Sequence, residues 1–361
     1  MWESPGVHPD ESHPRPAPSA VPPPTPDAIR RFLVDLGAPE AEIPDDPELA
    51  AQLAGDLVLA ADASRSLREV AGEAGVDVEE ARRMFRALGL RIDDPDAPAF
   101  SPADADFLRL ARSRLSDLLT DAERTEFLRV TGQALATIAE AAVASHVQGV
   151  ESRLRSPAEH VWVNAHMAAL GRDLAVHLAP AFLHHLRQAI RRQREAQSRR
   201  HRALVEMAVG FVDLVGFTDL SRQLDADELI ALITEFEAAA HELAADHDAR
   251  VVKLIGDEVM FAAVDPAAAV DLAVELVGRD HGREVVPRGG VAAGECVNLH
   301  GDYFGPVVNL AARLVDQAVP GEVLLDDAAA RASRRPTEPA GRRLLAGFTD
   351  PVRVHAIDAT P

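Results

Sequence analysis

Hydrophobic and polar positions follow different periods in the two halves of the chain. From residue 27 to about residue 202, Ala, Leu, Arg and Glu recur at three- and four-residue spacings, a pattern typical of amphipathic helices. From about residue 203 onward, apolar runs of strand length alternate with helical stretches. We therefore predict an α+β protein in which an all-α region is followed by a domain built around a sheet.

The second half predicts a defined order of elements. Strands are expected at residues 205–217, 250–256, 258–264, 288–299 and 322–327, and helices at residues 225–247, 266–279 and 306–318. The order is β-α-β-β-α-β with additions. It predicts a ferredoxin-like antiparallel sheet covered by helices.

The chain is expected to divide into four segments. Residues 1–26 are rich in proline and poor in aliphatic side chains, which predicts a disordered tail. Residues 27–185 predict a helical domain. Residues 186–204 include the one strongly basic stretch and predict a helix that links two domains. Residues 205–361 contain the predicted sheet.

Residues 66–90 of the helical domain resemble a helix-turn-helix. Gly75 supplies the turn and Asp77 can cap the second helix. Arginines on that helix would favour DNA, whereas Glu79 and Glu80 stand at the end where base contacts are made. We interpret the segment as a packing module rather than a DNA reader.

Composition narrows the possible partners. The formal net charge of −21 argues against general binding to nucleic acids or anionic membranes, because most of the surface would repel phosphate. The single cysteine, Cys296, excludes an intrachain disulfide and fits a reducing compartment. No uninterrupted apolar run reaches the length of a bilayer span. These features predict a cytoplasmic protein without a membrane partner.

Two aspartates form the first candidate site. Asp213 lies inside the apolar run 205–217, where an ionised carboxylate needs a compensating cation or hydrogen-bond donors. A cap on a nearby backbone turn would explain Asp213 equally well. Asp257 follows Gly256 in a predicted hairpin turn, and turn chemistry alone is its simplest explanation. Because that hairpin would pair beside the first strand, we expect the two carboxylates to lie together and to bind Mg²⁺ or Mn²⁺.

A second candidate site lies on a predicted helix. Asn309 and Arg313 are four residues apart in the helix expected to begin at Pro306, so they share one face. Near a helix N-terminus, they would offer a neutral hydrogen-bonding group and a positive charge to a ligand that carries phosphate.

Lys253 is the only lysine of the chain, and every other basic side chain of the lysine or arginine type is an arginine. One explanation is drift at a solvated strand end. The other is a site that needs a compact ammonium donor, which a planar guanidinium cannot imitate. The only tyrosine, Tyr303, follows Asp302 just before the helix of Asn309 and Arg313. This coincidence favours a functional lysine.

The segments FVDLVGFTDLS, VVKLIGDEVMF and GDYFGPVVNLAARL resemble, in this order, the three signature blocks of class III nucleotidyl cyclases. The resemblance covers about residues 205–357 and includes six functional positions. It implies that Asp213 and Asp257 hold two metal ions per active site. It also implies that Lys253 and Asp302 read the adenine ring.

The same resemblance gives roles to the helix residues. It implies that the pair Asn309 and Arg313 positions the ribose and stabilises the transition state. The implied enzyme is an adenylate cyclase, which converts ATP to 3′,5′-cyclic AMP and pyrophosphate. One metal ion would lower the pKa of the ribose 3′-hydroxyl while the second binds the triphosphate. In this family the metal-binding aspartates face the other four residues across a dimer interface, so an obligatory homodimer is implied.

The pair Lys253 and Asp302 predicts ATP rather than GTP. Adenine presents a ring-nitrogen acceptor beside an exocyclic amine, so the ammonium can donate to the first and the carboxylate can accept from the second. Guanine has an oxygen in place of that amine, and the carboxylate would repel it.

One position departs from the family pattern. Ala346 stands where many members have a lysine that contacts the triphosphate. Either Arg342 or Arg343 replaces that contact, or the triphosphate binds more weakly.

The helical half resembles, by architecture, the N-terminal autoinhibitory domain of a subclass of these cyclases that includes pH-responsive enzymes. One alternative is a nucleotide-sensing regulator with an inactive cyclase domain and a DNA-binding N-terminal half. Another is a cyclase that makes dinucleotides on a similar core. The six site residues and the acidic N-terminal half oppose the first, and the lack of a GGDEF-like hairpin opposes the second.

Overall fold

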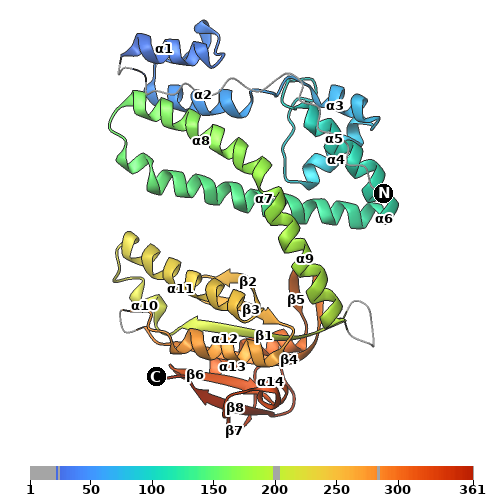
Figure 1. Ribbon diagram of the computed structural model, residues 1–361, viewed down its shortest axis with the longest axis vertical. Helices are drawn as coiled ribbons and strands as arrows, with labels where there is room; N and C mark the ends of the chain where they lie inside the picture. Colours follow the sequence, from blue (N-terminus) through green and yellow to red (C-terminus); the bar gives the residue numbers. More distant parts are fainter. Residues whose placement is uncertain (1–21, 23–24, 198–203, 283–284, 361) are drawn as a thin grey trace. The chain divides into compact units, whose positions relative to one another are not determined.

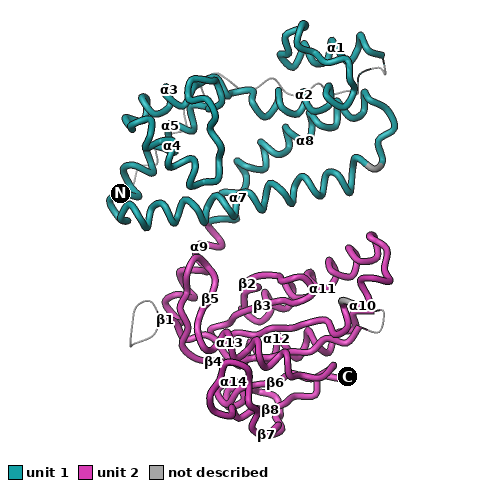
Figure 2. The backbone as a smooth tube through the Cα atoms, turned by 180° about the vertical axis from the view of Figure 1, so that it is seen from behind, with its two compact units in different colours: residues 1–182 teal, residues 183–361 magenta. Residues whose placement is uncertain are grey.

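The computed structural model describes residues 22, 25–197, 204–282 and 285–360. The chain divides into two compact units, unit 1 (residues 1–182) and unit 2 (residues 183–361), shown in Figure 2. The predicted Pro-rich tail, residues 1–26, lies outside the described residues except at positions 22, 25 and 26.

Unit 1 is helical, as its sequence period predicts (Figure 1). Its α-helices are α1 (Pro26–Asp35), α2 (Pro47–Leu59), α3 (Leu67–Ala74), α4 (Val78–Ala87), α5 (Pro102–Leu110), α6 (Ser116–Leu118), α7 (Asp121–Gly149) and α8 (Pro157–His177). Short turns of 3₁₀ or π-helix occur at Glu40–Glu42, Ala111–Leu115 and Glu151–Arg153.

Helices α3 and α4 form the segment that resembles a helix-turn-helix. Gly75 ends α3 with φ at +66°, a left-handed conformation that glycine adopts without a steric cost. The Asp77 carboxylate then caps α4 by accepting a hydrogen bond from the backbone N–H of Glu79 at 2.9 Å. Local turn and cap chemistry therefore sets the bend between the two helices.

Two separate cores stabilise unit 1. One lies among α1, α2 and α8, and the other lies among α3, α4 and α5 with Leu128 of α7. The 29-residue helix α7 buries only Leu128 and Gly132. Most of the apolar surface of α7 is thus left outside the core of the single chain.

Unit 2 contains one mixed sheet. Its strands are β1 (Leu204–Leu214), β2 (Arg250–Ile255), β3 (Glu258–Ala263), β4 (Pro287–Leu299), β5 (Asp302–Phe304), β6 (Glu322–Asp326), β7 (Glu338–Arg343) and β8 (Val352–Asp358). Its helices are α10 (Phe217–Leu220), α11 (Ala226–Asp246), α12 (Pro266–Gly278), α13 (Pro306–Gln317) and α14 (Asp327–Ala332). The predicted α+β class and β-α-β-β-α-β core are confirmed.

The strand order is β2-β3-β1-β4-β6-β8-β7, and β5 pairs with β4. All pairs are antiparallel except β4 with β6, which is parallel. The expectation of an antiparallel sheet is therefore wrong at this one pair. Helix α13 connects β4 with β6 through β5, and such a crossover is what allows two neighbouring strands to run in the same direction.

Helices cover both faces of the sheet. Alternate residues of β1 point to opposite sides: Val212 packs with α11 and α12, whereas Val209 packs with α13. Because both faces of β1 are covered, its sequence is a nearly continuous apolar run. An acidic residue in this strand therefore stands out against its neighbours.

The predicted linker helix, residues 186–204, overlaps helix α9 (Ala179–Ala196), which begins earlier in the chain. Gln197 bridges to Val205 of β1, and residues 198–203 lie outside the described residues. Within the described ranges, every helix is too short or too polar to cross a membrane.

Candidate active site

The two predicted metal-binding aspartates lie at one end of the sheet. Asp213 stands near the end of β1, opposite Glu258 of β3 and Arg288 of β4 in the strand register. Asp257 occupies the turn between β2 and β3, and its carbonyl oxygen accepts a hydrogen bond from the backbone N–H of Leu214 at 3.3 Å. The hairpin turn thereby brings Asp257 to the end of β1.

Arg288 compensates the charge of Asp213. Its Nε and Nη2 atoms donate to Oδ2 of Asp213 at 3.1 and 2.9 Å. Its Nη1 atom donates to the carbonyl oxygen of Asp316 at 3.1 Å, near the C-terminal end of α13. Arg288 therefore joins the aspartate of β1 to the helix that carries Asn309 and Arg313.

Burial perturbs the carboxylates around this arginine. It raises the pKa of Asp213 above the usual value, an effect that the Arg288 hydrogen bonds oppose and that the Asp257 charge reinforces. Burial also raises the pKa of Glu258 to about 7, with a further contribution from Asp213. A group of carboxylates that resist ionisation in a cleft or at a strand end is a frequent mark of a functional site.

Sequence reasoning missed Arg288 and Glu258. A signal for Glu258 was present, since it begins an otherwise apolar strand immediately after Asp257. Arg288 lies 75 residues from Asp213 along the chain, and only the pairing of β1 with β4 brings them together.

The chemistry of these side chains fits a divalent cation. Both aspartates offer hard oxygen ligands, which Mg²⁺ and Mn²⁺ prefer. Both Arg288 contacts use Oδ2 of Asp213, and no hydrogen bond between described residues involves Oδ1. In the described part of the chain, no three His, Cys, Asp or Glu side chains form a complete ligand group.

Lys253 and Asp302 meet directly. Lys253 Nζ donates to Asp302 Oδ2 at 2.6 Å, although the two residues are 49 positions apart. The other carboxylate oxygen, Oδ1, accepts from the backbone N–H of Tyr303 at 2.8 Å. The side chains are 42% and 28% exposed, so both can reach a ligand from solvent.

Asn309 and Arg313 lie on α13, which begins with Pro306 at its first position. Arg313 Nη1 donates to Asp316 Oδ2 at 2.8 Å on the same helix. Between described residues, no hydrogen bond connects Asn309 or Arg313 to the aspartates of the sheet end or to the lysine pair. Among the described residues, the six predicted side chains therefore do not form one hydrogen-bonded cluster.

Ala346 lies between β7 and β8. Of the two arginines considered as substitutes for a lysine there, Arg343 donates from Nη1 to the carbonyl oxygen of Gln317 at 2.9 Å.

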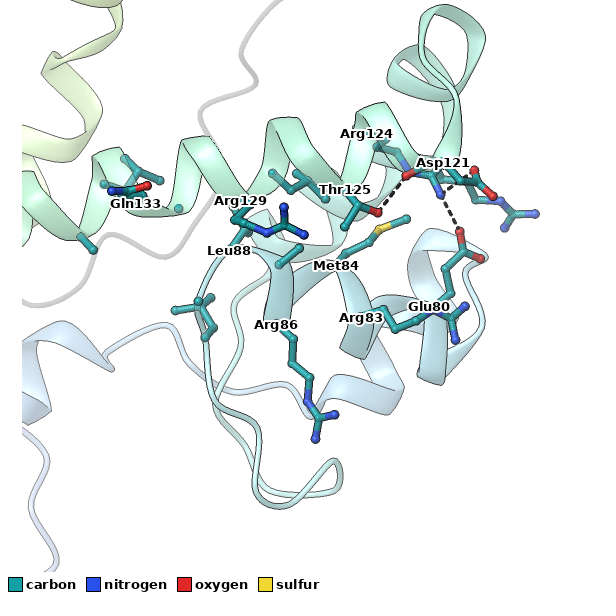
Figure 3. A pocket seen from close by; sticks show the side chains of 18 of the residues that line it. Glu80, Arg83, Met84, Arg86, Leu88, Asp121, Arg124, Thr125, Arg129 and Gln133 are labelled. Atoms are coloured by element: carbon teal, nitrogen blue, oxygen red, sulfur yellow. Dashed lines mark hydrogen bonds and ion pairs between the residues drawn. The ribbon is translucent and has the colours of Figure 1, made fainter. Parts of the chain in front are cut away.

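A large hollow of about 1200 Å³ lies in unit 1, between α4 and α7 (Figure 3). Its wall carries several arginines, and Arg124 contacts both Asp121 at 3.2 Å and Glu80 at 3.6 Å. None of the six residues predicted from the sequence lines it.

Two family models match successive parts of the chain. Residues 27–193 match the family model described as an adenylate cyclase regulatory domain, and residues 199–339 match the model described as an adenylate and guanylate cyclase catalytic domain. An adenylate cyclase of Streptomyces coelicolor is 36% identical over 302 residues, which cover 81% of this chain and 77% of that protein. The chain belongs to the class III adenylate cyclases.

Other relatives agree with this assignment. A pH-sensitive adenylate cyclase of Mycobacterium tuberculosis is 32% identical over 311 residues, which cover 81% of this chain and 77% of that protein. Among solved structures, the crystal structure of the adenylyl cyclase CyaB from P. aeruginosa matches 42% of this chain and 93% of its own, with 24% identity and a TM-score of 0.39. The predicted family and enzyme class are confirmed. Catalytic domains of this family generally depend on divalent metal ions and act as dimers.

Proposed function

We propose that this adenylate cyclase forms 3′,5′-cyclic AMP and pyrophosphate from ATP at two equivalent sites of a homodimer. The observation that carries the choice of ATP is the contact between Lys253 and Asp302. An exposed ammonium and an exposed carboxylate, held 2.6 Å apart, match the acceptor and donor that adenine presents side by side.

Asp213 and Asp257 would hold two ions of Mg²⁺ or Mn²⁺, which neutralise the triphosphate and lower the pKa of the ribose 3′-hydroxyl. Arg288 supports this role because it fixes one oxygen of Asp213 and balances the charge of the half-buried carboxylate when no ion is bound.

Asn309 would orient the ribose, and Arg313 would stabilise charge on the α-phosphate during displacement of pyrophosphate. Arg313 is half exposed and forms an ion pair with the half-exposed Asp316. An exposed ion pair of this kind contributes little energy, so the guanidinium can turn to a substrate at low cost.

A homodimer completes the site in this proposal. Within one chain, Asn309 and Arg313 have no hydrogen bond to the Asp213 end among the described residues, and symmetry would supply each group from the partner. The cytoplasm is the proposed location, since ATP and a reduced thiol such as that of Cys296 are both found there.

In this proposal residues 27–185 restrain catalysis, which residues 205–361 carry out. Residues 186–204 transmit the state of the restraining domain to the catalytic domain. The match of residues 27–193 to a cyclase regulatory domain supports this division. The test compares the specific activity of the full chain with that of residues 203–361 at acid and at neutral pH. Equal activity under both conditions would contradict a restraining role.

The catalytic proposal is tested by chromatography of the products that the full-length protein makes from ATP or GTP with Mn²⁺. Cyclic AMP from ATP alone is expected. In Lys253→Arg, kcat/KM for ATP should fall at least about tenfold, because a charged hydrogen bond to the base is lost. No cyclic nucleotide from either substrate, in a protein that is folded and dimeric, would overturn the proposal.

A further inference from the structure

The proposed base-reading pair joins two strands that do not pair with each other. Lys253 lies on β2, an edge strand that pairs with β3. Asp302 begins β5, a three-residue strand that pairs with β4. Among the described residues, no backbone ladder connects β2 to β5, so side chains must set the distance between the ammonium and the carboxylate.

The ion pair between Lys253 and Asp302 is too weak to fix the distance between its own two groups. Both side chains are partly exposed, and each would also have to bond the adenine ring. An exposed ion pair is weak and loses part of its geometry when either group takes another partner. A constant spacing therefore requires a contact outside the pair.

Arg250 provides such a contact. It precedes Lys253 by three positions on β2, and its Nη2 atom donates to the carbonyl oxygen of Gly301. The guanidinium carbon also lies 5.5 Å from the ring centroid of Tyr303, within range of a cation–π interaction. Gly301 and Tyr303 are the two neighbours of Asp302 in the chain.

The turn that carries Asp302 has the geometry of a tight hairpin. His300 and Gly301 have φ values of +56° and +80°, as in the two central residues of a type I′ turn. After this turn the Tyr303 side chain is buried, with only 5% exposed. Arg250 thus contacts the turn at two places, the exposed carbonyl of Gly301 and the buried ring of Tyr303.

We propose that Arg250 is a positioning residue that keeps Asp302 at the distance from Lys253 at which both can read adenine. This inference rests on the proposed function of that pair. Arg250 does not contact the nucleotide in this account. Its loss would weaken the recognition of adenine and leave the metal-binding aspartates and Arg313 unchanged.

A second arginine allows the positive charge of Arg250 to be tested apart from its contacts. Arg192 of α9 lines the same cavity of about 130 Å³ as Arg250, Gly301 and Tyr303. Burial, followed by the nearby charge of Arg250, lowers the pKa of Arg192. Among the described residues, Arg192 donates no hydrogen bond to the turn.

The experiment uses the full-length protein and the variants Arg250→Gln, Arg250→Lys and Tyr303→Phe. Arg192→Gln removes a charge from the same cavity, and Arg279→Gln removes an exposed arginine whose partner is Glu242. For each protein, KM and kcat are measured with ATP and with GTP. Equilibrium binding of a non-hydrolysable ATP analogue and thermal unfolding by circular dichroism are measured in parallel.

In Arg250→Gln, KM for ATP and the dissociation constant of the analogue should rise roughly tenfold, while kcat stays within about threefold. The preference for ATP over GTP should fall by a similar factor. Arg250→Lys should recover part of the affinity, since an ammonium can donate to the same carbonyl and lie over the same ring. Tyr303→Phe should match the wild type because the ring remains.

The inference is overturned if the wild type makes cyclic AMP and Arg250→Gln keeps KM, analogue affinity and ATP preference within about twofold. A fall in kcat at unchanged KM, or an equal effect in Arg192→Gln, would also overturn it. A wild type without activity would contradict the proposed function instead. In that case, equal binding of the ATP analogue by the wild type and by Arg250→Gln would still reject the inference. If Arg250→Gln does not fold, Arg250→Lys and Tyr303→Leu, which removes the ring, carry the same comparison.

Discussion

Each unit of the chain contains a concentration of charged side chains, but the two differ in the burial of their acidic residues. The hollow between α4 and α7 in unit 1 measures about 1200 Å³ (Figure 3). On its wall the Asp121 and Glu80 side chains are 93% and 30% exposed, beside Arg124, whose side chain is 11% exposed. The sheet end in unit 2 holds Asp213 with 19% of its side chain exposed, against Arg288 with 26%. A search by cavity size would therefore select unit 1, whereas a search for carboxylates with a raised pKa would select the sheet end of unit 2.

This difference indicates that a raised carboxylate pKa is a better guide than cavity size to the catalytic site of this protein. An exposed ion pair is screened by water and has little influence on a reacting group. A half-buried carboxylate stays ionised only with a compensating cation or hydrogen-bond donors, and Arg288 supplies both at Asp213. The small carboxylate group of unit 2 is therefore where we expect substrate charge to be handled.

The largest expected effect comes from exchanging one carboxylate in each region. Asp213→Asn should lower cyclic AMP formation at least about 100-fold, because a neutral amide is a poor ligand for a divalent ion. Its matched control, Asp121→Asn in unit 1, should stay within about threefold of the wild type. Initial rates at saturating Mn²⁺ measure both. Comparable losses in the two variants would erase the contrast between the regions.

An intermediate effect is expected from adding one methyl group near each region. A Cβ on Gly132 would come within 2.2 Å of the Leu88 carbonyl oxygen in unit 1, and one on Gly210 would come within 2.2 Å of the Phe261 ring in unit 2. Gly132→Ala and Gly210→Ala should each lower the free energy of unfolding by about 1–3 kcal/mol.

Urea unfolding followed by circular dichroism and, in a Trp2→Phe background, by Trp162 fluorescence separates the two glycine variants. Trp162 packs on the core of α1, α2 and α8, so its signal reports unit 1 and should respond to Gly132→Ala more than to Gly210→Ala. Gly171→Ala is the control: no atom lies within 4 Å of its added Cβ, and alanine should stabilise α8 by about 0.5–1 kcal/mol. A control that destabilises as much as Gly132→Ala would refute the steric explanation.

The last prediction concerns the chemical reactivity of Cys296, which has no role in the proposed catalysis. Burial raises the pKa of this thiol to about 11, and only 1% of the residue is exposed. Iodoacetamide should therefore label the folded protein at least about 100-fold more slowly than the urea-unfolded protein at pH 8, since the thiolate is the reactive form. Mass spectrometry measures the rates. Rapid labelling of the folded protein would show that unit 2 opens at this position.

The sequence by itself determined the features that depend on local chemistry. Period alone separated the helical half from the half with the sheet, and Gly75 with Asp77 identified a helix end and a cap. The motifs around Asp213, Lys253 and Asp302 were enough to predict the family. Each of these signals is contained in a short segment of the chain, within which sequence spacing determines which residues are neighbours in the structure.

Tertiary structure decided which distant side chains meet. Register between β1 and β4 places Arg288 on Asp213, and burial at that end raises the pKa of Glu258. The β4–β5 turn brings Gly301 and Tyr303 to Arg250. No local pattern encodes these contacts, because strand pairing joins residues tens of positions apart and burial depends on the whole fold.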